Sequence, residues 1–384
     1  MKAISIPPAA LPTPSLFLPR SKKHGISSLF SRSEVKSYLL YGYGRIALLD
    51  GLRILDCGEG SNVLLPSYNC RTAVEPFREL SIEPRFYTVS LNLEPDIKDI
   101  KSKIDKNTKA ILAINYFGFP QNIGGIQGIC RKHGLYFIED NAHGPLSQKD
   151  CRLLGTFGDI GFSSIWKFLG VPNGAVLFIN NDKLISSKGN ILVALASQNQ
   201  LPPVSKKSIC TYILNSLLNY FELRYRFRAD FIRDIYNKLS PKAEIDVSRL
   251  FQDCKVRMSG LSLKIAGKQN LEEVCRKRKE NYIFWLGEML GRKDVQVLFK
   301  DLSEGVCPLY FPVIVEEVES FLQEMLHKGI PAYRWPHLPK EIGGNPEYPT
   351  ANFLAEHVVV LPVHQSVDRD YLARAKSIHR VSYI

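Results

Sequence analysis

Short apolar runs alternate with helical segments from about residue 34 to residue 185, and this pattern constrains the fold of the 384-residue chain most. The runs have the length of buried strands, and the segments between them have the length of crossover connections. Strands that helices cover on both faces are apolar throughout rather than alternating. The sequence therefore predicts an α/β domain with a mostly parallel sheet between helices.

The expected elements can be given by residue range. Strands are expected at 62–65, 85–89, 110–114, 135–139, 161–165 and 175–179, and helices at 44–55, 70–80, 96–103 and 123–133. Active sites in such sheets form beyond the carboxyl ends of the strands. The loops that leave these strands are therefore the place to look for chemistry.

The rest of the chain suggests further parts. Residues 1–33 contain helix-breaking prolines and no continuous apolar core, which predicts an extended arm rather than a signal peptide. A large domain is expected at 34–245, with a helical insertion at about 201–243. A smaller α/β domain is expected at 246–384, where a long helix at 271–290 precedes a strand, helix and strand.

Lys167 and Asp140 carry the strongest chemical signal. Asp140 ends the apolar run "GLYFIED", and Lys167 follows the apolar run "GDIGFSSIW". A pyridoxal phosphate enzyme needs a lysine that binds the cofactor aldehyde and a carboxylate that keeps the pyridine nitrogen protonated. The two residues therefore predict pyridoxal 5′-phosphate as cofactor. His143, on the loop after Asp140, could pack on the cofactor ring or bond its phenolic oxygen; a purely structural histidine is the alternative.

The formal net charge of +12 favours anionic partners such as phosphorylated substrates, nucleotides or an acidic membrane face. No nucleic-acid-binding signature accompanies the charge, so no nucleic acid is expected as a partner. No apolar run reaches the roughly 18 residues of a membrane span. The eight cysteines lack the CxxC spacing of a zinc site, and we expect a reduced, cytoplasmic protein without a metal.

Residues 206–242 have a distinct composition, with eight basic and three acidic residues and apolar side chains at helical spacing. One interpretation is a basic amphipathic surface that meets a membrane or a partner. The other is a helical hairpin packed on the main domain or on a second subunit. We favour the hairpin, because apolar stripes at helical spacing usually belong to a core.

Six motifs, in order, resemble those of the DegT/DnrJ/EryC1/StrS family of fold type I, pyridoxal phosphate-dependent sugar aminotransferases. The resemblance runs from about residue 41 to residue 364 through "YGYGRIALLDGL", "LPSYNCRTAV", "EDNAHG", "GDIGFSSIWK", "VRMSGLSLKIAG" and "LPVH". It implies a seven-stranded sheet and a homodimer. It also implies transfer of an amino group, with glutamate as donor, to a keto-sugar, nucleotide-linked, in polysaccharide or glycoconjugate biosynthesis.

The resemblance also implies which residues meet the cofactor phosphate. Gly44, Arg45 and Ile46 open a helix whose free amides would bind it; the alternative is that the glycines only allow a tight turn. Ser163 or Ser164 would bond it as well. The loop before the lysine reads "SIWK", about two residues shorter than the common family pattern, which indicates an atypical subgroup and leaves the two serines open.

Two other positions depart from the family pattern. The aromatic residue that stacks on the ring aligns with Cys70, so Cys70 or the nearby Tyr68 is expected there. Lys255 stands where the family has an asparagine that crosses the dimer interface to the cofactor phosphate, and Arg257 follows it. A cation could bind that phosphate more strongly than the neutral asparagine does. The alternative for this pair is a solvated basic edge.

Two rival functions follow from the same resemblance. Some relatives are dehydratases in which histidine replaces the lysine, and Lys167 argues against that activity. The second rival is a non-catalytic or regulatory homologue, associated with a membrane through residues 206–242.

Overall fold

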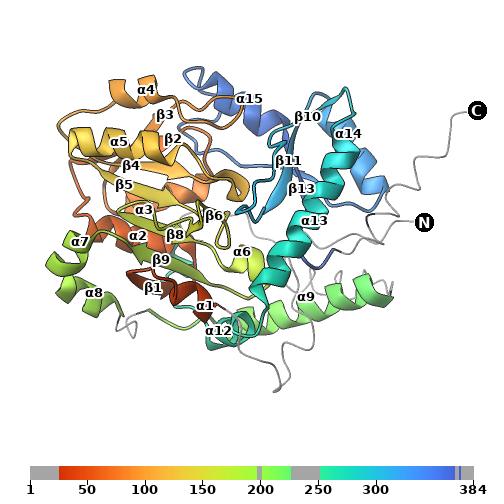
Figure 1. Ribbon diagram of the computed structural model, residues 1–384, viewed down its shortest axis with the longest axis horizontal. Helices are drawn as coiled ribbons and strands as arrows, with labels where there is room; N and C mark the ends of the chain where they lie inside the picture. The colour runs from red at the N-terminus through yellow and green to blue at the C-terminus, as the bar shows by residue number, and fades with distance from the viewer. Residues whose placement is uncertain (1–25, 197–200, 226–250, 368–371, 373–384) are drawn as a thin grey trace, which may run out of the picture.

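The structure is a computed structural model that describes residues 26–196, 201–225, 251–367 and 372, with only the backbone of 217–225. Its main feature is a seven-stranded sheet with the order β1-β9-β8-β5-β4-β2-β3 (Figure 1). The strands are β1 (Ser37–Tyr41), β2 (Asn62–Pro66), β3 (Glu83–Tyr87), β4 (Thr108–Ile114), β5 (Tyr136–Asp140), β8 (Ile160–Ser163) and β9 (Ala175–Ile179).

Strands β3, β2, β4, β5 and β8 pair in parallel, and β9 pairs antiparallel with both β8 and β1. The prediction of a mostly parallel α/β sheet is confirmed. Strand β1 was not predicted: its first two residues are only partly buried or exposed, so the segment lacks the continuous apolar run used to find the others.

Helices connect these strands. They are α2 (Gly44–Ile54), η2 (Arg71–Ala73), α3 (Glu75–Glu79), α4 (Ile97–Ser102), η3 (Tyr116–Gly118), α5 (Ile123–His133), α6 (Trp166–Leu169), α7 (Asp182–Ser187) and α8 (Gly189–Ala196). The single helix expected at 70–80 is wrong, because the structure has a 3₁₀ turn followed by the short helix α3. Pro76 lies at the start of α3, where a missing N–H costs least, and it cannot continue a helix that began earlier.

A second, antiparallel sheet has the order β10-β11-β13-β12 and lies beside the first (Figure 1). Its strands are β10 (Val295–Val297), β11 (Tyr310–Val315), β12 (Tyr333–Arg334) and β13 (Val358–Pro362). The same part of the chain contains the helices α12 (Gly260–Ala266), α13 (Leu271–Met289), α14 (Val318–His327) and α15 (Pro349–His357). The strand, helix and strand expected after the long helix are present as β11, α14 and β13. A two-stranded hairpin, β6 (Gln148–Lys149) and β7 (Arg152–Leu153), completes the sheets.

The amino-terminal arm and the insertion are described in part. From residue 26 the arm is not extended as expected: it contains the helix α1 (Ser27–Phe30). Ile26 is buried there, and its amide donates to the Ala266 carbonyl at 3.2 Å, so packing holds this turn on the carboxyl-terminal part. The insertion contains the helix α9 (Lys206–Tyr225). The second half of the expected hairpin lies outside the described residues.

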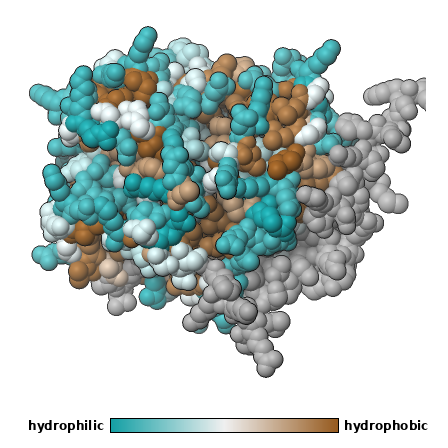
Figure 2. Space-filling view, in the orientation of Figure 1, coloured by the Kyte–Doolittle hydropathy of each residue, from teal (hydrophilic) through white to brown (hydrophobic). Residues whose placement is uncertain are grey.

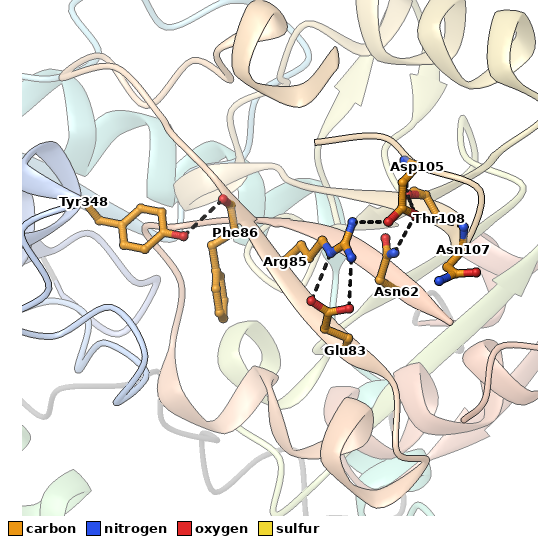
Figure 3. A network of polar contacts seen from close by, with 8 residues as sticks. All are labelled: Asn62, Glu83, Arg85, Phe86, Asp105, Asn107, Thr108 and Tyr348. Atoms are coloured by element: carbon orange, nitrogen blue, oxygen red, sulfur yellow. Dashed lines mark hydrogen bonds and ion pairs between the residues drawn. The ribbon is translucent and has the colours of Figure 1, made fainter. Parts of the chain in front are cut away.

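A polar network lies at the amino-terminal ends of the strands of the main sheet, opposite their carboxyl ends (Figure 3). Arg85 donates to Asp105 at 2.6 Å and to Glu83 at 3.0 Å, and Asn62 donates to Asp105 at 2.9 Å. These contacts join the starts of β2 and β3 to the loop before β4. They hold the strands in register, and they lie away from the carboxyl ends of the strands, where a site can form.

Hydrophilic side chains cover much of the face in Figure 2, between separate apolar patches. No helix in the described ranges is both long and apolar enough to cross a membrane.

Candidate active site

A cavity of about 120 Å³ lies at the carboxyl ends of β4, β5 and β8, where the sheet topology predicts a site. Its wall brings together seven of the residues singled out from the sequence: Gly44, Arg45, Cys70, Asp140, His143, Ser164 and Lys167. They come from the start of α2, the loop after β2, the end of β5 with the loop that follows it, and the segment from the end of β8 into α6. The cavity therefore joins motifs that are far apart in the chain.

Asp140 and Lys167 form an electrostatic pair in this wall. Burial raises the pKa of Asp140 to about 6, although its hydrogen bond from the Ala142 amide at 2.9 Å and the charge of Lys167 oppose the shift. Burial lowers the pKa of Lys167, and the Asp140 carboxylate opposes that shift. A lysine with a lowered pKa has more of the neutral amine that acts as a nucleophile.

His143 is buried beside this pair in a defined orientation. Its Nδ1 accepts a hydrogen bond of 3.4 Å from the amide of Phe117, whose φ of 55° is uncommon for a residue with a side chain. Burial holds the pKa of His143 well below its ordinary value. The ring is therefore neutral at pH 7, and with Nδ1 as acceptor its proton lies on Nε2.

One end of the cavity has the properties of an anion site. Gly44 begins α2 next to Ser164, and a Cβ at position 44 would lie 2.8 Å from the Ser164 Oγ. Within the described chain, the buried Nη1 of Arg45 and the buried Nδ2 of Asn69 have no hydrogen-bond partner. Two unpaired buried donors beside a helix amino terminus suit a phosphate group.

Two residues expected at the phosphate lie behind the wall. The Ser163 hydroxyl accepts a hydrogen bond of 3.2 Å from Asn141 Nδ2. Ile46 is buried in the hydrophobic core, and its amide donates to the Tyr43 carbonyl at 3.1 Å. Of the two serines left open by the sequence, Ser164 is the one in the cavity wall.

The aromatic residues of the cavity differ from those expected. Tyr68 is fully buried outside the cavity lining, and its hydroxyl donates to the Trp335 carbonyl. Cys70 lines the cavity, with its Sγ 3.3 Å from the Thr72 hydroxyl. Trp335 also lines it and meets the His143 ring edge to face at 4.9 Å between centroids. Sequence reasoning missed Trp335, Tyr43, Asn69, Thr72 and Trp166.

Lys255 lies outside the cavity lining of its own chain. Its ammonium pairs with Glu79 at 2.5 Å. The next residue, Val256, accepts a hydrogen bond of 2.9 Å from the Gly42 amide. The segment that carries Lys255 thus packs behind the glycine turn that opens α2.

Comparison with known proteins finds similarity to one family over part of the chain. Residues 39–194 match the sequence profile of the DegT/DnrJ/EryC1/StrS aminotransferase family. The chain is 28% identical to GDP-perosamine synthase of Vibrio cholerae over 155 residues, 40% of this chain and 42% of that protein. It is 26% identical to dTDP-4-dehydro-2,3,6-trideoxy-D-glucose 4-aminotransferase of Saccharopolyspora spinosa over 338 residues, 85% and 79% of the two chains. The match thus spans about two fifths of the first relative and about four fifths of the second.

Solved structures show the same fold. PseC of Helicobacter pylori, an aminotransferase involved in the biosynthesis of pseudoaminic acid, is 15% identical with a TM-score of 0.68, and the alignment covers 98% of both chains. The sugar aminotransferase CalS13 of Micromonospora echinospora is 16% identical with a TM-score of 0.66 and full coverage of both chains. These likenesses establish the architecture.

Proposed function

We propose, because the chain belongs to the DegT/DnrJ/EryC1/StrS aminotransferase family, that it is a pyridoxal 5′-phosphate-dependent aminotransferase. The observation that carries this proposal is the single cavity that contains Lys167 and Asp140 together with the unpaired guanidinium nitrogen of Arg45. An amine of lowered pKa, a buried carboxylate and an anion site are the three features that this cofactor requires.

The residues of the wall fit the cofactor. Arg45, Ser164 and the start of α2 would hold its phosphate, and Asp140 would face its pyridine nitrogen. When bound, pyridoxal phosphate supplies an electron sink for the substrate carbanion. Lys255 would approach the same phosphate from a second subunit, in the place of the asparagine that crosses the dimer interface in the family that the chain resembles.

Lys167 is the proposed acid and base. Its neutral amine could bond the cofactor aldehyde. Once released, the amine would take a proton from the substrate carbon and deliver it to the former aldehyde carbon of the cofactor. The carboxylate of Asp140 would keep the pyridine nitrogen of the cofactor protonated, because the two would form a charge-assisted hydrogen bond in a buried site. His143 would present its Nε2 proton as a hydrogen-bond donor, and together with Trp335, whose ring it contacts, it would cover the cofactor ring.

The proposed reaction moves an amino group, with glutamate as donor, to a keto-sugar that is nucleotide-linked. The net charge of +12 suits a diphosphate on the acceptor. The presence of Lys167 in the cavity favours amine transfer over the dehydration known for related proteins with histidine at this place.

Further proposals concern the whole molecule. We place the large domain at 34–245 and the smaller domain at 246–384, and we propose a cytoplasmic homodimer in which the segment around Lys255 meets the partner's site. Assembly would bring a cation to a phosphate that the chain's own Arg45 reaches from the other side.

Replacing Lys167 tests the proposal. Lys167→Ala should lose the visible absorbance of a lysine-bound cofactor and all amine transfer from glutamate, while its circular dichroism stays that of the wild type. Lys183→Ala, on the exposed helix α7, is the matched control. A borohydride-stable cofactor adduct on Lys167→Ala would overturn the assignment. A wild-type protein that binds the cofactor without any spectral response to glutamate would instead support the regulatory homologue.

A further inference from the structure

The helix that carries Lys167 is only four residues long, Trp166–Leu169. At the start of α6, the amides of Phe168 and Leu169 both donate to the carbonyl of the N-cap residue Ile165. A helix of this length leaves its last carbonyls without backbone donors, and an isolated turn is not stable by itself. Its position must therefore come from contacts with the surrounding chain.

Side chains supply the missing donors at three consecutive carbonyls. The Phe168 carbonyl accepts from Gln365 Nε2 at 2.7 Å and from Arg278 Nη2 at 3.2 Å. The Leu169 carbonyl accepts from Gln269 Nε2, and the Gly170 carbonyl accepts from the Tyr212 hydroxyl. We call Tyr212, Gln269, Arg278 and Gln365 the donor collar.

The donor collar comes from four separate segments. Tyr212 lies on the insertion helix α9, Gln269 in the turn between α12 and α13, Arg278 on α13 and Gln365 just after β13. All four residues lie outside the segment 39–194 that matches the family, whereas α6 lies inside it. The lysine helix is thus held by parts of the chain that belong to the insertion and to the carboxyl-terminal region.

Arg278 is the most constrained member. It is fully buried, and its guanidinium lies 4.2 Å from the Phe168 ring centroid. It also donates to the carbonyls of Pro308 and Leu309 at 3.1 and 3.2 Å and to Gln365 Oε1 at 3.0 Å. Among the described residues no carboxylate pairs with it. A buried cation held only by neutral acceptors fixes geometry, because each nitrogen of the rigid fork donates to at least one partner.

We propose that the donor collar positions Lys167, so that the insertion helix α9 takes part in amine transfer through Tyr212 without reaching the cavity. This inference rests on the proposed function for its catalytic consequence, but the positioning of the lysine can be measured without cofactor. If α6 were less firmly held, the Lys167 amine would be more exposed to water and would move with the helix by a fraction of a helical turn. Displacements of about 1 Å cost up to about a hundredfold in rate.

Tyr212→Phe is the sharpest test, because it removes one hydroxyl and leaves the ring. The full-length protein without cofactor is labelled with trinitrobenzenesulfonate over a pH series, and the label on Lys167 is quantified by mass spectrometry. We expect the midpoint for Lys167 to rise by about 0.5 to 1 pH unit, toward the value of an exposed lysine. In the loaded enzyme kcat should fall about tenfold with little change in the KM for the amino donor.

Tyr282→Phe is the matched control. Its hydroxyl also donates to a backbone carbonyl, that of Phe299 at 2.6 Å, and it lies outside the collar. We expect this variant to lose thermal stability without moving the Lys167 midpoint or kcat. Gln269→Met combined with Tyr212→Phe should shift the midpoint further than Tyr212→Phe alone.

The proposal is overturned if Tyr212→Phe behaves like Tyr282→Phe, with a lower melting temperature and an unchanged Lys167 midpoint. Its failure is distinct from failure of the proposed function. A wild-type protein that binds no cofactor at Lys167 would end the proposed function, yet the labelling midpoints of the cofactor-free variants would still decide whether the collar positions the lysine.

Discussion

Gly44 leaves room for the hydroxyl of Ser164: a Cβ at position 44 would lie 2.8 Å from the Ser164 Oγ. Close approach, and not a left-handed backbone angle, is therefore what favours glycine here, because a side chain at position 44 would displace the hydroxyl. The start of α2 and the hydroxyl share one end of the cavity, so a ligand oxygen there can meet both.

Ser164→Ala should weaken cofactor binding about tenfold, because it removes one hydrogen bond to a doubly charged phosphate. Ser163→Ala is the matched comparison. Its hydroxyl bonds Asn141 inside the protein, so we expect lower thermal stability with cofactor affinity near that of the wild type. Titration of the cofactor, followed by absorbance, measures both variants. The reverse order of effects would assign the phosphate contact to Ser163.

Arg45→Met should weaken cofactor binding by roughly ten- to a hundredfold, the value of a charge-assisted hydrogen bond. The same change should stabilise the cofactor-free protein, because it removes a buried donor that has no partner within the described chain. Arg53→Met, on the same helix but paired with Asp50 at 2.8 Å, is the control. Equal cofactor affinity in Arg45→Met and wild type would exclude Arg45 from the phosphate site.

The sequence predicted the parts of this site that depend on local pattern. Asp140 and Lys167 follow apolar strands, and the carboxyl ends of neighbouring strands must meet at one edge of the sheet. Tyr68 was misplaced for a related reason. It lies in the loop after β2, as Cys70 does, but its hydroxyl donates to the carbonyl of Trp335. Which of two nearby side chains faces a cavity depends on packing, which sequence spacing does not determine.

Contacts between distant segments could not be predicted. Trp335 reaches His143 from a loop of the second sheet, and no periodicity marks a residue that lies between two short elements. The bond from Tyr212 to the Gly170 carbonyl joins two regions with no shared motif. Such contacts arise from the way the two sheets and the insertion pack together, and only the fold shows them.

Lys255 offers a test of the homodimer. Lys167→Ala and Lys255→Ala should each be nearly inactive, and mixing them under conditions of subunit exchange should restore roughly one quarter of the wild-type activity. Half of randomly re-formed dimers are mixed, and each mixed dimer has one site with neither lesion. Lys277→Ala, on the exposed side of α13, serves as the control substitution. Full activity of Lys255→Ala would show that its pairing with Glu79 is its whole role.

Asp140→Asn should separate stability from activity. Burial raises the pKa of this carboxyl from 3.8 to about 6, so the folded, cofactor-free protein holds a proton there more tightly than the unfolded chain. The group therefore costs stability above pH 6, and the cost disappears as the pH falls below about 4. A shift of two pKa units corresponds to about 3 kcal/mol.

The neutral amide keeps the shape and the acceptor for the Ala142 amide, and it removes that cost. At pH 7.5 the cofactor-free Asp140→Asn protein should therefore be up to about 3 kcal/mol more stable to urea than the wild type, and the difference should shrink to about 0.6 kcal/mol at pH 4. Amine transfer should fall about a hundredfold or more, because no charge remains to hold the ring nitrogen protonated. Urea unfolding at both pH values and turnover with glutamate measure the two effects. Activity within about threefold of the wild type would remove Asp140 from its role at the ring nitrogen, whatever its effect on stability.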